Sequence, residues 1–372
     1  MMRVNLGDVA KESRETLSGS KKGLPVVGLE HIAPGELSLT TWDVDGENTF
    51  TKVFRKGQIL FGRRRAYLKK AAVAPFDGIC SGDITVIEAL PDRLSPELLP
   101  FIIQNDTFFD YAVGKSAGSL SPRAKWEHLR DFELNVPPLA EQRKLADLLW
   151  AANTARVAYK HLLAATDELV KSRFVEMFGA RLGDGAVELS EICTIITDGT
   201  HQPPKFIDTG IPFLLVSNIV DNEINYTTSK FISRDDYDVL IKRTPIEVGD
   251  VLLTTVGSYG NPAVVKSEQE FCFQRHIAYL KPKQKQVNSV YLHAVFLSSA
   301  VREQIEVKVK GIAQKTLNLS ELKTIRVNLP PLDLQTRFAD FVRQADKSKF
   351  TLQQTIDELE ATYKSLLREN LG

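Results

Sequence analysis

The chain has 372 residues, of which 43% are hydrophobic and 25% charged. This length predicts two domains of roughly 100–200 residues, not one compact core. No stretch approaches the roughly 18 consecutive apolar residues of a membrane span, and Cys80, Cys193 and Cys272 form no Cys-x-x-Cys pair. Widely spaced cysteines suit a reducing compartment and make a structural metal site unexpected, so we expect a cytoplasmic protein.

The formal net charge is zero, because 47 basic residues are balanced by 47 acidic ones. This excludes a uniformly basic nucleic-acid-binding protein. Phosphate contacts need positive potential only where a duplex lies, so the local distribution matters more than the sum.

The first segment, residues 1–134, has mixed character. Short apolar runs at 58–61 and 84–87, separated by Gly, Pro and Asn, predict strands, and residues 96–109 predict a helix. Eight basic residues and no acidic one lie between Asn48 and Phe76, namely Lys52, Arg55, Lys56, Arg63, Arg64, Arg65, Lys69 and Lys70. The triplet at 63–65 concentrates positive charge without local neutralisation. Arginine suits bidentate contact with guanine or phosphate, which favours DNA contact; a solvated strand face is the alternative.

The sequence pattern of the second segment, residues 135–179, predicts a long helix. Two prolines stand at its entrance, and neither proline nor glycine interrupts residues 139–178. A helix of this length spans about 60 Å. Apolar and small residues recur at alternating spacings of four and three, which predicts a heptad seam at Leu145, Leu148, Ala152, Ala155, Tyr159, Leu162, Thr166 and Leu169.

A short flexible joint is expected at residues 180–186, Ala-Arg-Leu-Gly-Asp-Gly-Ala. The next segment, residues 187–327, again mixes predicted strands, at 212–216 and 250–256, with a predicted helix at 290–306. Gly257-Ser-Tyr-Gly260, Phe273-Gln-Arg-His276 and Lys308-Val-Lys310 supply weaker DNA-contact candidates. Gln, Arg and His can read base edges, but they also occur on any protein surface.

The last segment, residues 328–372, repeats the second. Asn328-Leu-Pro-Pro-Leu-Asp-Leu-Gln335 matches Asn135-Val-Pro-Pro-Leu-Ala-Glu-Gln142 at an offset of 193 residues, and the same offset matches Gly118 with Gly311. A second uninterrupted helix is expected over 332–371, with its seam at Phe338, Phe341, Ala345, Ser348, Leu352 and Leu359. The chain is therefore a tandem duplication.

The two long helices each carry an apolar stripe that needs a partner. We expect them to pair with each other as a coiled coil, with Ala152, Ala155, Ala345 and Ser348 allowing close approach. Packing of each helix on its own globular segment, or homodimerisation, is the alternative.

Catalytic signatures are missing from the sequence. It contains no phosphate-binding Gly-x-x-x-x-Gly-Lys-Ser/Thr loop, no Gly-x-Gly-x-x-Gly, no His-Glu-x-x-His and no Gly-x-Ser-x-Gly. Gln202-Pro-Pro-Lys205 lacks both the amide or acid and the aromatic of the Asn/Asp-Pro-Pro-Tyr/Phe motif of amino-methyltransferases, so we interpret it as a loop. We expect no enzyme activity in this chain.

The repeat, the Pro-Pro-Leu-x-x-Gln helix entrances and the long helices together resemble the specificity subunit of type I restriction-modification systems. Further similar stretches are Asp198-Gly-Thr-His201, Gly210-Ile-Pro-Phe-Leu214 with Ser217-Asn-Ile219, Gly249-Asp-Val-Leu-Leu253, Gly257-Ser-x-Gly260 and Gly311-Ile-Ala-Gln-Lys-Thr-Leu-Asn-Leu-Ser-Glu-Leu322. The first globular segment keeps a degenerate version, with Leu24-Pro-Val-Val-Gly28 and Lys125-Trp-Glu-His-Leu129 in the corresponding places.

The resemblance implies an α+β fold with two target recognition domains, 1–134 and 187–327, separated by two long antiparallel helices that form a coiled-coil spacer. Each domain would read one half of a bipartite double-stranded DNA site, and helix length would set the gap between the halves. The implied partners are two adenine methyltransferase subunits and, in the nuclease form, ATP-dependent restriction subunits. S-adenosylmethionine, ATP and Mg would belong to those partners, and the chain itself would bind no cofactor or metal.

Two other functions were weighed. A non-enzymatic scaffold that joins two ligand- or protein-binding domains would fit the zero net charge, and a nuclease fragment would need an acidic metal cluster that the sequence does not display.

Candidate DNA-binding residues combine the basic run with the loop motifs: Lys52, Arg55, Arg63, Arg64, Arg65, Tyr67, Lys69, Lys70, Lys115, Arg123, Thr200, His201, Lys205, Ser258, Tyr259, Gln274, Arg275, His276, Lys308, Lys310 and Gln314. Candidate residues of the spacer helices are Leu145, Leu148, Ala152, Ala155, Leu162, Phe338, Phe341, Ala345 and Leu352.

Overall fold

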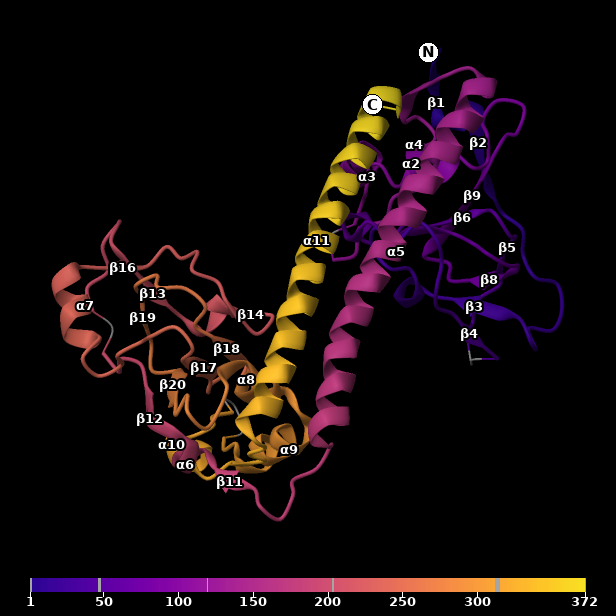
Figure 1. The fold of residues 1–372 in the computed structure, drawn as a ribbon. Coiled ribbons are helices and arrows are strands. Elements are labelled where there is room, and N and C mark those ends of the chain that lie inside the picture. Colours follow the sequence, from indigo (N-terminus) through magenta and orange to yellow (C-terminus); the bar gives the residue numbers. More distant parts are fainter. Residues whose placement is uncertain (1, 46–47, 119, 203, 312–314, 372) are drawn as a thin grey trace. The chain divides into compact units, whose positions relative to one another are not determined.

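The computed structural model of the chain describes residues 2–45, 48–118, 120–202, 204–311 and 315–371. Internal contacts divide it into two compact units. Unit 1 comprises residues 1–161 and 353–372, and unit 2 comprises residues 162–352. Each unit therefore holds one globular part together with a stretch of each long helix, α5 (Leu139–Phe178) and α11 (Leu332–Leu371) (Figure 1).

Unit 1 builds its globular part from two four-stranded sheets and one strand pair, in the orders β2-β9-β6-β7, β4-β3-β8-β5 and β1-β10. Its elements are β1 (Met2–Asn5), α1 (Leu6–Val9), β2 (Ala10–Ser13), β3 (Pro25–Val27), β4 (Asp43–Val44), β5 (Lys52–Phe54), β6 (Ile59–Gly62), β7 (Ala71–Val73), β8 (Gly78–Cys80), β9 (Ile84–Ala89), α2 (Leu99–Ile103), α3 (Asp106–Gly114), α4 (Trp126–Leu129) and β10 (Glu133–Val136). Two short 3-10 turns, η1 (Leu29–His31) and η2 (Ala66–Leu68), complete the unit.

Unit 2 repeats this plan, with sheet orders β12-β20-β17-β18, β16-β13-β19, β11-β21 and β14-β15. Its elements are β11 (Val187–Glu188), α6 (Leu189–Ile192), β12 (Cys193–Asp198), β13 (Ile211–Leu214), η3 (Val216–Asn218), β14 (Ile219–Val220), β15 (Glu223–Ile224), β16 (Phe231–Ile232), α7 (Arg234–Leu240), β17 (Val251–Thr254), β18 (Pro262–Val264), β19 (Cys272–Phe273), β20 (Ile277–Pro282), α8 (Ser289–Leu297), α9 (Ser299–Lys308), α10 (Leu319–Lys323) and β21 (Arg326–Val327).

The central sheet of each unit is buried on both faces, which explains why its strands are continuous apolar runs. In β6, Ile59 and Phe61 face a core formed with the helices, while Leu60 between them faces the second sheet. In β17, Leu253 faces the helices and Leu252 the opposite core. Side chains of a strand alternate between its two faces, so one strand serves two apolar layers.

The single late helix expected in each globular segment is instead two short helices. Residues 96–109 overlap α2 and α3, and Asn105 caps the start of α3 by accepting a hydrogen bond from the Thr107 N–H with its side chain. Residues 290–306 overlap α8 and α9, with Ser298 in an extended conformation between them. A residue with extended dihedrals ends one helix and caps the next, and this break was not visible in the hydrophobic pattern.

The glutamine of the duplicated Pro-Pro-Leu-x-x-Gln motif ties each long helix to its own globular part. Gln142 accepts a hydrogen bond from the Ser95 N–H (2.9 Å) and donates to the carbonyl of Pro137 (2.9 Å). Gln335 accepts from the Asn288 N–H (2.8 Å) and donates to the carbonyl of Pro330 (2.8 Å). Both side chains are buried, where unpaired amides are costly, so the motif fixes the entrance of each helix.

The helices α5 and α11 pack together. In unit 1, the Arg156 guanidinium lies 5.7 Å from the centre of the Tyr363 ring and 3.9 Å from a Glu360 carboxylate oxygen. The buried residues Leu367 and Leu371 join the core of the globular part. Helix pairing is confirmed, and each helix also packs on the globular part that was considered as the alternative.

In unit 2 the same helix pair is held by aromatic side chains. Phe174 and Phe178 each lie 5.5 Å from Phe338 between ring centres, and Lys349 reaches Asp167 at 3.1 Å. As residue numbers rise along α5, the partners on α11 fall, so the pairing is antiparallel.

The predicted heptad seam of α5 is displaced by one residue from the observed one. Leu148, Leu162 and Leu169 are more than half exposed (51%, 52% and 55%), whereas Leu149, Asn153 and Phe174 are buried. The sequence pattern favoured leucine over polar residues. The fold instead turns inward Asn153 and Arg156, which hydrogen-bond to each other at 2.9 Å.

The remaining predicted spacer positions divide by burial. Leu145, Phe338 and Ala345 are buried, Ala152, Ala155, Phe341 and Leu352 are half-buried, and Ser348 is exposed. Ser348 therefore does not supply the close approach expected of it.

Candidate nucleic-acid interface

Four loops of unit 2 meet at one end of the central sheet, and backbone hydrogen bonds fasten them. The Thr200 N–H, after β12, donates to the carbonyl of Phe273 (3.0 Å), and the Arg275 N–H donates to the carbonyl of Thr200 (3.0 Å). The Thr255 N–H, after β17, donates to the carbonyl of His276 (2.9 Å), and the Leu317 N–H donates back to Thr255 (2.9 Å). We call this junction, residues 198–201, 255–260, 274–276 and 315–318, the unit 2 corner.

Glycines in the family-like motifs are required by this backbone. A Cβ at Gly199 would stand 2.1 Å from the carbonyl oxygen of Phe273, which belongs to the strand that Thr200 bridges. Gly257 and Gly260 have φ of +75° and +80°, a region that L-residues with side chains rarely enter. The Asp-Gly-Thr-His and Gly-Ser-x-Gly motifs therefore report close backbone approach and turn geometry.

A cavity of about 300 Å³ opens at the unit 2 corner, lined by Asp198, His201, Thr255, Val256, Arg275, His276 and the Thr316–Leu319 segment. The carboxylate of Asp198 holds His201 (2.9 Å) and Arg243 (2.6 Å). Burial and the neighbouring Arg275 lower the pKa of His276. A neutral histidine offers one donor and one acceptor, so His276 can pair with groups of either kind on a base edge.

Unit 1 contains the same junction, which we call the unit 1 corner, residues 63–65, 81–83 and 117–124. The Arg63 N–H donates to the carbonyl of Asp83 (3.0 Å) and the Ala124 N–H donates to Arg63 (2.8 Å), as Thr255, His276 and Leu317 do in unit 2. The Arg65 N–H donates to the carbonyl of Pro122 (2.8 Å). The backbone is thus conserved between the units while its side chains differ.

Charge at the unit 1 corner is concentrated around Asp83. Its carboxylate accepts from Arg123 Nε (2.7 Å) and lies 3.5 Å from Arg64. The hydrogen bond from Arg123 is the main reason that the pKa of Asp83 lies below its usual range. Arg64 also donates to the Ser121 hydroxyl (2.6 Å).

Much of the basic run between Asn48 and Phe76 is neutralised by the fold, although in the triplet at 63–65 only Arg64 lies within 4.0 Å of a carboxylate among the described residues. Carboxylates that are distant in the sequence fold against it: Glu15 and Asp77 pair with Arg55, Asp83 with Arg64, Asp106 with Lys69, and Glu12 lies 3.7 Å from Lys52. Two lysine ammonium groups donate to backbone carbonyls, Lys52 to Ile84 (2.8 Å) and Lys70 to Leu29 (2.6 Å). A short stretch of sequence shows only neighbours along the chain, whereas the fold brings in acidic residues from strand β2, from loops and from α3.

Other predicted DNA-binding residues are placed as follows. Tyr67 and Ser258 are exposed, Lys205 is exposed, and Lys115 lies 5.5 Å from the centre of the Tyr111 ring. Lys308 and Lys310 both pair with Glu321 (3.5 and 2.8 Å), and Tyr259 donates to the Glu306 carboxylate (2.9 Å). Gln314 lies outside the described residues.

The structure also shows residues at the two corners that the sequence did not indicate as part of a site. Asp83 organises two of the predicted arginines, and Arg243, on the loop after α7, is bound to Asp198. No motif marks either residue, because each pairs with residues that are distant along the chain: Asp83 with Arg64 and Arg123, 19 and 40 positions away, and Arg243 with Asp198, 45 positions away. The 193-residue offset could have placed Asp83 opposite His276 and so flagged it.

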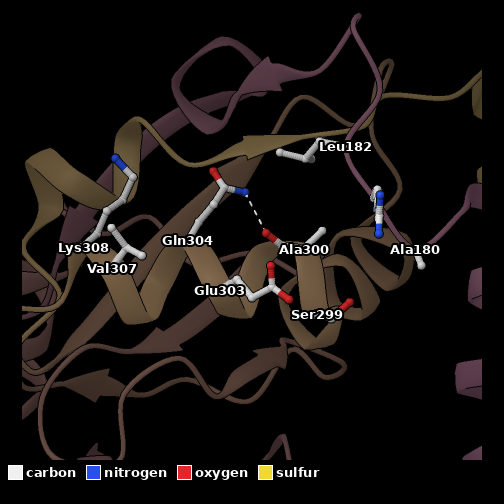
Figure 2. A pocket seen from close by; sticks show the side chains of 9 residues that line it. Ala180, Leu182, Ser299, Ala300, Glu303, Gln304, Val307 and Lys308 are labelled. Carbon is white, nitrogen blue, oxygen red and sulfur yellow. Dashed lines mark hydrogen bonds between the residues drawn. The ribbon is translucent and has the colours of Figure 1, made fainter.

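A second, wider cavity of unit 2 lies away from the corner. It has a volume of about 720 Å³ and is lined by residues 180–182 and the exposed side of α9 (Figure 2). Gln304 is one of the residues that line it, and its amide donates to the carbonyls of Ala300 (3.1 Å) and Arg326 (2.8 Å). Arg181, Glu303 and Lys308 add charged groups to its lining.

Within the described residues, no group of three or more His, Cys, Asp or Glu side chains could hold a metal ion. Among the same residues, no helix is long and apolar enough to cross a membrane. Burial raises the pKa of each of the three cysteine thiols, Cys80, Cys193 and Cys272, to about 12, so they are inert core residues.

Comparison with known proteins adds to this geometry. Residues 185–361 match the family described as Type I restriction modification DNA specificity domain. The chain is 28% identical over 248 residues to the type I restriction enzyme EcoBI specificity subunit of Escherichia coli, covering 58% of this chain and 52% of that protein. The chain thus spans about half the length of this relative.

Two further similarities extend over nearly the whole chain. The putative type I restriction enzyme MjaX specificity subunit of Methanocaldococcus jannaschii is 22% identical over 377 residues, covering 91% of this chain and 83% of that protein. The fold is shared with the crystal structure of the type I restriction-modification system S subunit from M. genitalium, at a TM-score of 0.63 and 12% identity, covering 100% of this chain and 96% of that one. The resemblance of this chain to the specificity subunits of type I restriction-modification systems is thereby confirmed, with the DNA specificity domain of that family matched over residues 185–361.

Proposed function

We propose that the chain is the DNA-recognition subunit of a type I restriction-modification complex and that each unit reads one half of a bipartite double-stranded site. The observation that carries the proposal is the duplicated corner: one backbone arrangement is built twice and carries different polar side chains in each copy. Two different readers on one scaffold are what an asymmetric two-part site requires.

In this proposal the chain has no catalytic role. Methyl transfer and ATP-driven cleavage belong to two adenine methyltransferase subunits and to restriction subunits, which bring S-adenosylmethionine, ATP and Mg. The chain contributes sequence recognition and docking, and the length of α5 and α11 sets the gap between the two half-sites.

Adenine methylation in the source genome tests the proposal directly. Mapping methylated adenines with and without the gene is expected to show a bipartite motif that disappears on deletion. Unchanged methylation, together with no binding of the purified chain to any duplex from a random pool, would leave the scaffold that joins two ligand-binding domains as the better account.

A further inference from the structure

Most cations predicted to contact DNA have carboxylate or carbonyl partners inside their own unit. Among the exposed arginines of the two corners, Arg64 is paired with Asp83, and Arg65 and Arg275 have no carboxylate partner in the described part of the chain. In the described part of the chain, no carboxylate lies within 4.0 Å of the guanidinium of Arg65 or Arg275. Both side chains are exposed, and each lies at the corner of its unit. Arg275 makes one weak contact, from Nε to His276 Nε2 at 3.4 Å.

Arg65 occupies a backbone position that disfavours any side chain. Its φ is +54°, and the equivalent residue of unit 2 is Gly257, with φ of +75°. The equivalence rests on matching hydrogen bonds, from the Arg65 N–H to Pro122 and from the Gly257 N–H to Lys315. Unit 2 has a glycine at this position, which avoids the strain, whereas unit 1 keeps a residue with a long side chain there. Retention of a strained residue points to a functional constraint.

Arg275 stands on the other side of the same corner. Gln274, Arg275 and His276 correspond to Ser81, Gly82 and Asp83, because the Gln274 N–H donates to Leu214 (3.1 Å) as the Ser81 N–H donates to Val27 (3.0 Å). The arginine of unit 2 thus comes from the β19–β20 connection, and that of unit 1 from the exit of β6. In the described residues each corner therefore has one exposed arginine without a carboxylate partner, carried by a different loop, whereas Arg63 of unit 1 is partly buried.

We propose that Arg65 in unit 1 and Arg275 in unit 2 are the residues that determine the base specificity of the two half-sites, each by bidentate contact with a guanine. The proposal rests on the proposed DNA-recognition function. Arginine pairs with guanine O6 and N7 through its planar fork, and neither guanidinium must give up an ion pair to do so. Arg64 and Arg123 share the carboxylate of Asp83 and shape the corner, and Arg55 and Lys69 are paired with carboxylates outside it.

Arginine-to-lysine variants separate base reading from phosphate contact, because lysine keeps the charge but loses the fork. Full-length wild type, Arg65→Lys and Arg275→Lys are used to select from a pool of random duplexes, and the bound sequences are read. Each variant is expected to lose preference for one guanine by about ten- to hundred-fold, in one half-site only. Its salt dependence should match that of the wild type. Exposed lysines whose ammonium groups have no partner side chain in the described residues, Lys22 of unit 1 and Lys285 of unit 2, provide alanine controls that should leave both half-sites unchanged.

Three other outcomes would overturn the assignment. Unchanged preference in both lysine variants, uniform weakening at all positions, or loss in the half-site read by the other unit would each show that these arginines do not read bases as proposed, although the chain still recognises DNA. Selection of no sequence at all by the wild type would instead overturn the proposed function itself. Far-ultraviolet circular dichroism of each variant confirms that a lost preference does not reflect unfolding.

Discussion

In unit 1 the exit of β6 carries three consecutive arginines, and the β8–β9 connection carries the aspartate that binds two of the corner's cations. In unit 2 the exit of β17 is Thr255-Val-Gly257, and the β19–β20 connection carries Gln274, Arg275 and His276. The backbone hydrogen bonds that join the exit of β6 or β17 to the neighbouring loops correspond between the two corners. A recognition surface can therefore diverge without changing the fold, since strand pairing and loop fastening depend on main-chain groups that every residue supplies.

The helix entrances are the opposite case, because both backbone and side chain are kept there. Gln142 and Gln335 make the same set of hydrogen bonds in their units. A buried amide with three partners tolerates no substitution that leaves those partners unpaired, whereas an exposed corner tolerates many.

The largest expected effect is the loss of stability when either of these glutamines is replaced. Replacing Gln335 with Ala leaves the Asn288 N–H and the carbonyls of Gln286 and Pro330 without their hydrogen-bond partner. The free energy of unfolding of unit 2 should fall by about 2–3 kcal/mol. Gln142→Ala should do the same to unit 1. Hydrogen exchange locates the loss, at residues 286–288 in one variant and 93–95 in the other. Gln344→Ala, at an exposed position of α11, is the matched control; equal effects from all three would refute the assigned role.

The next largest effect is on DNA affinity, in variants that add a carboxylate to the unit 2 corner or remove one from the unit 1 corner. His276→Asp places a carboxylate beside Arg275 and should weaken DNA binding about ten-fold at low salt, whereas Asp83→Asn frees Arg64 and Arg123 and should strengthen it. In the second variant the dependence of log K on log salt should steepen by about one to two. Asp184→Asn, in the linker, controls for net charge. If affinity follows net charge alone, the control will equal Asp83→Asn and the corners have no special role.

A smaller effect on stability is expected at the equivalent positions Gly257 and Arg65, which both have a positive φ. Gly257→Ala should cost about 1 kcal/mol, because φ of +75° disfavours a Cβ. Arg65→Gly should leave stability unchanged or raise it slightly while removing the proposed base reader. Chemical denaturation measures both changes. A marked loss of stability in Arg65→Gly would show that the arginine is kept for packing.

The smallest effect concerns pH and His293 of unit 2. Burial, assisted by the charge of Lys266, lowers the pKa of this imidazole. A hydrogen bond to the Asn222 carbonyl (3.1 Å) and the charges of Glu223 and Asp346 act in the opposite direction. A lowered folded-state pKa stabilises the fold above the unfolded value of about 6.5, and this stability is lost as pH falls below it. Unfolding followed from pH 7.5 to 5 should therefore show a decline that is shallower in His293→Gln. Identical slopes in the two proteins would assign the decline to other groups.

Much of the fold follows from the sequence alone. Duplication, the absence of Pro and Gly over 139–178 and 332–371, and the apolar runs at 58–61 and 250–256 predicted the two long helices and the central strands, and the helices have those bounds. These features are local or repetitive, and helix and strand formation depends mainly on such patterns.

Tertiary structure alone decided which charges are free and which helix face is covered. The run of eight cations looked unopposed because its counterions, such as Glu15 and Asp106, lie in other elements. The seam of α5 moved by one residue because the partner helix supplies Glu360 and Tyr363 to Arg156, a side chain that hydrophobicity would place in water. Local patterns determine which elements form, but the pairing of polar groups depends on contacts between distant residues, and that pairing determines which arginines remain free to read DNA.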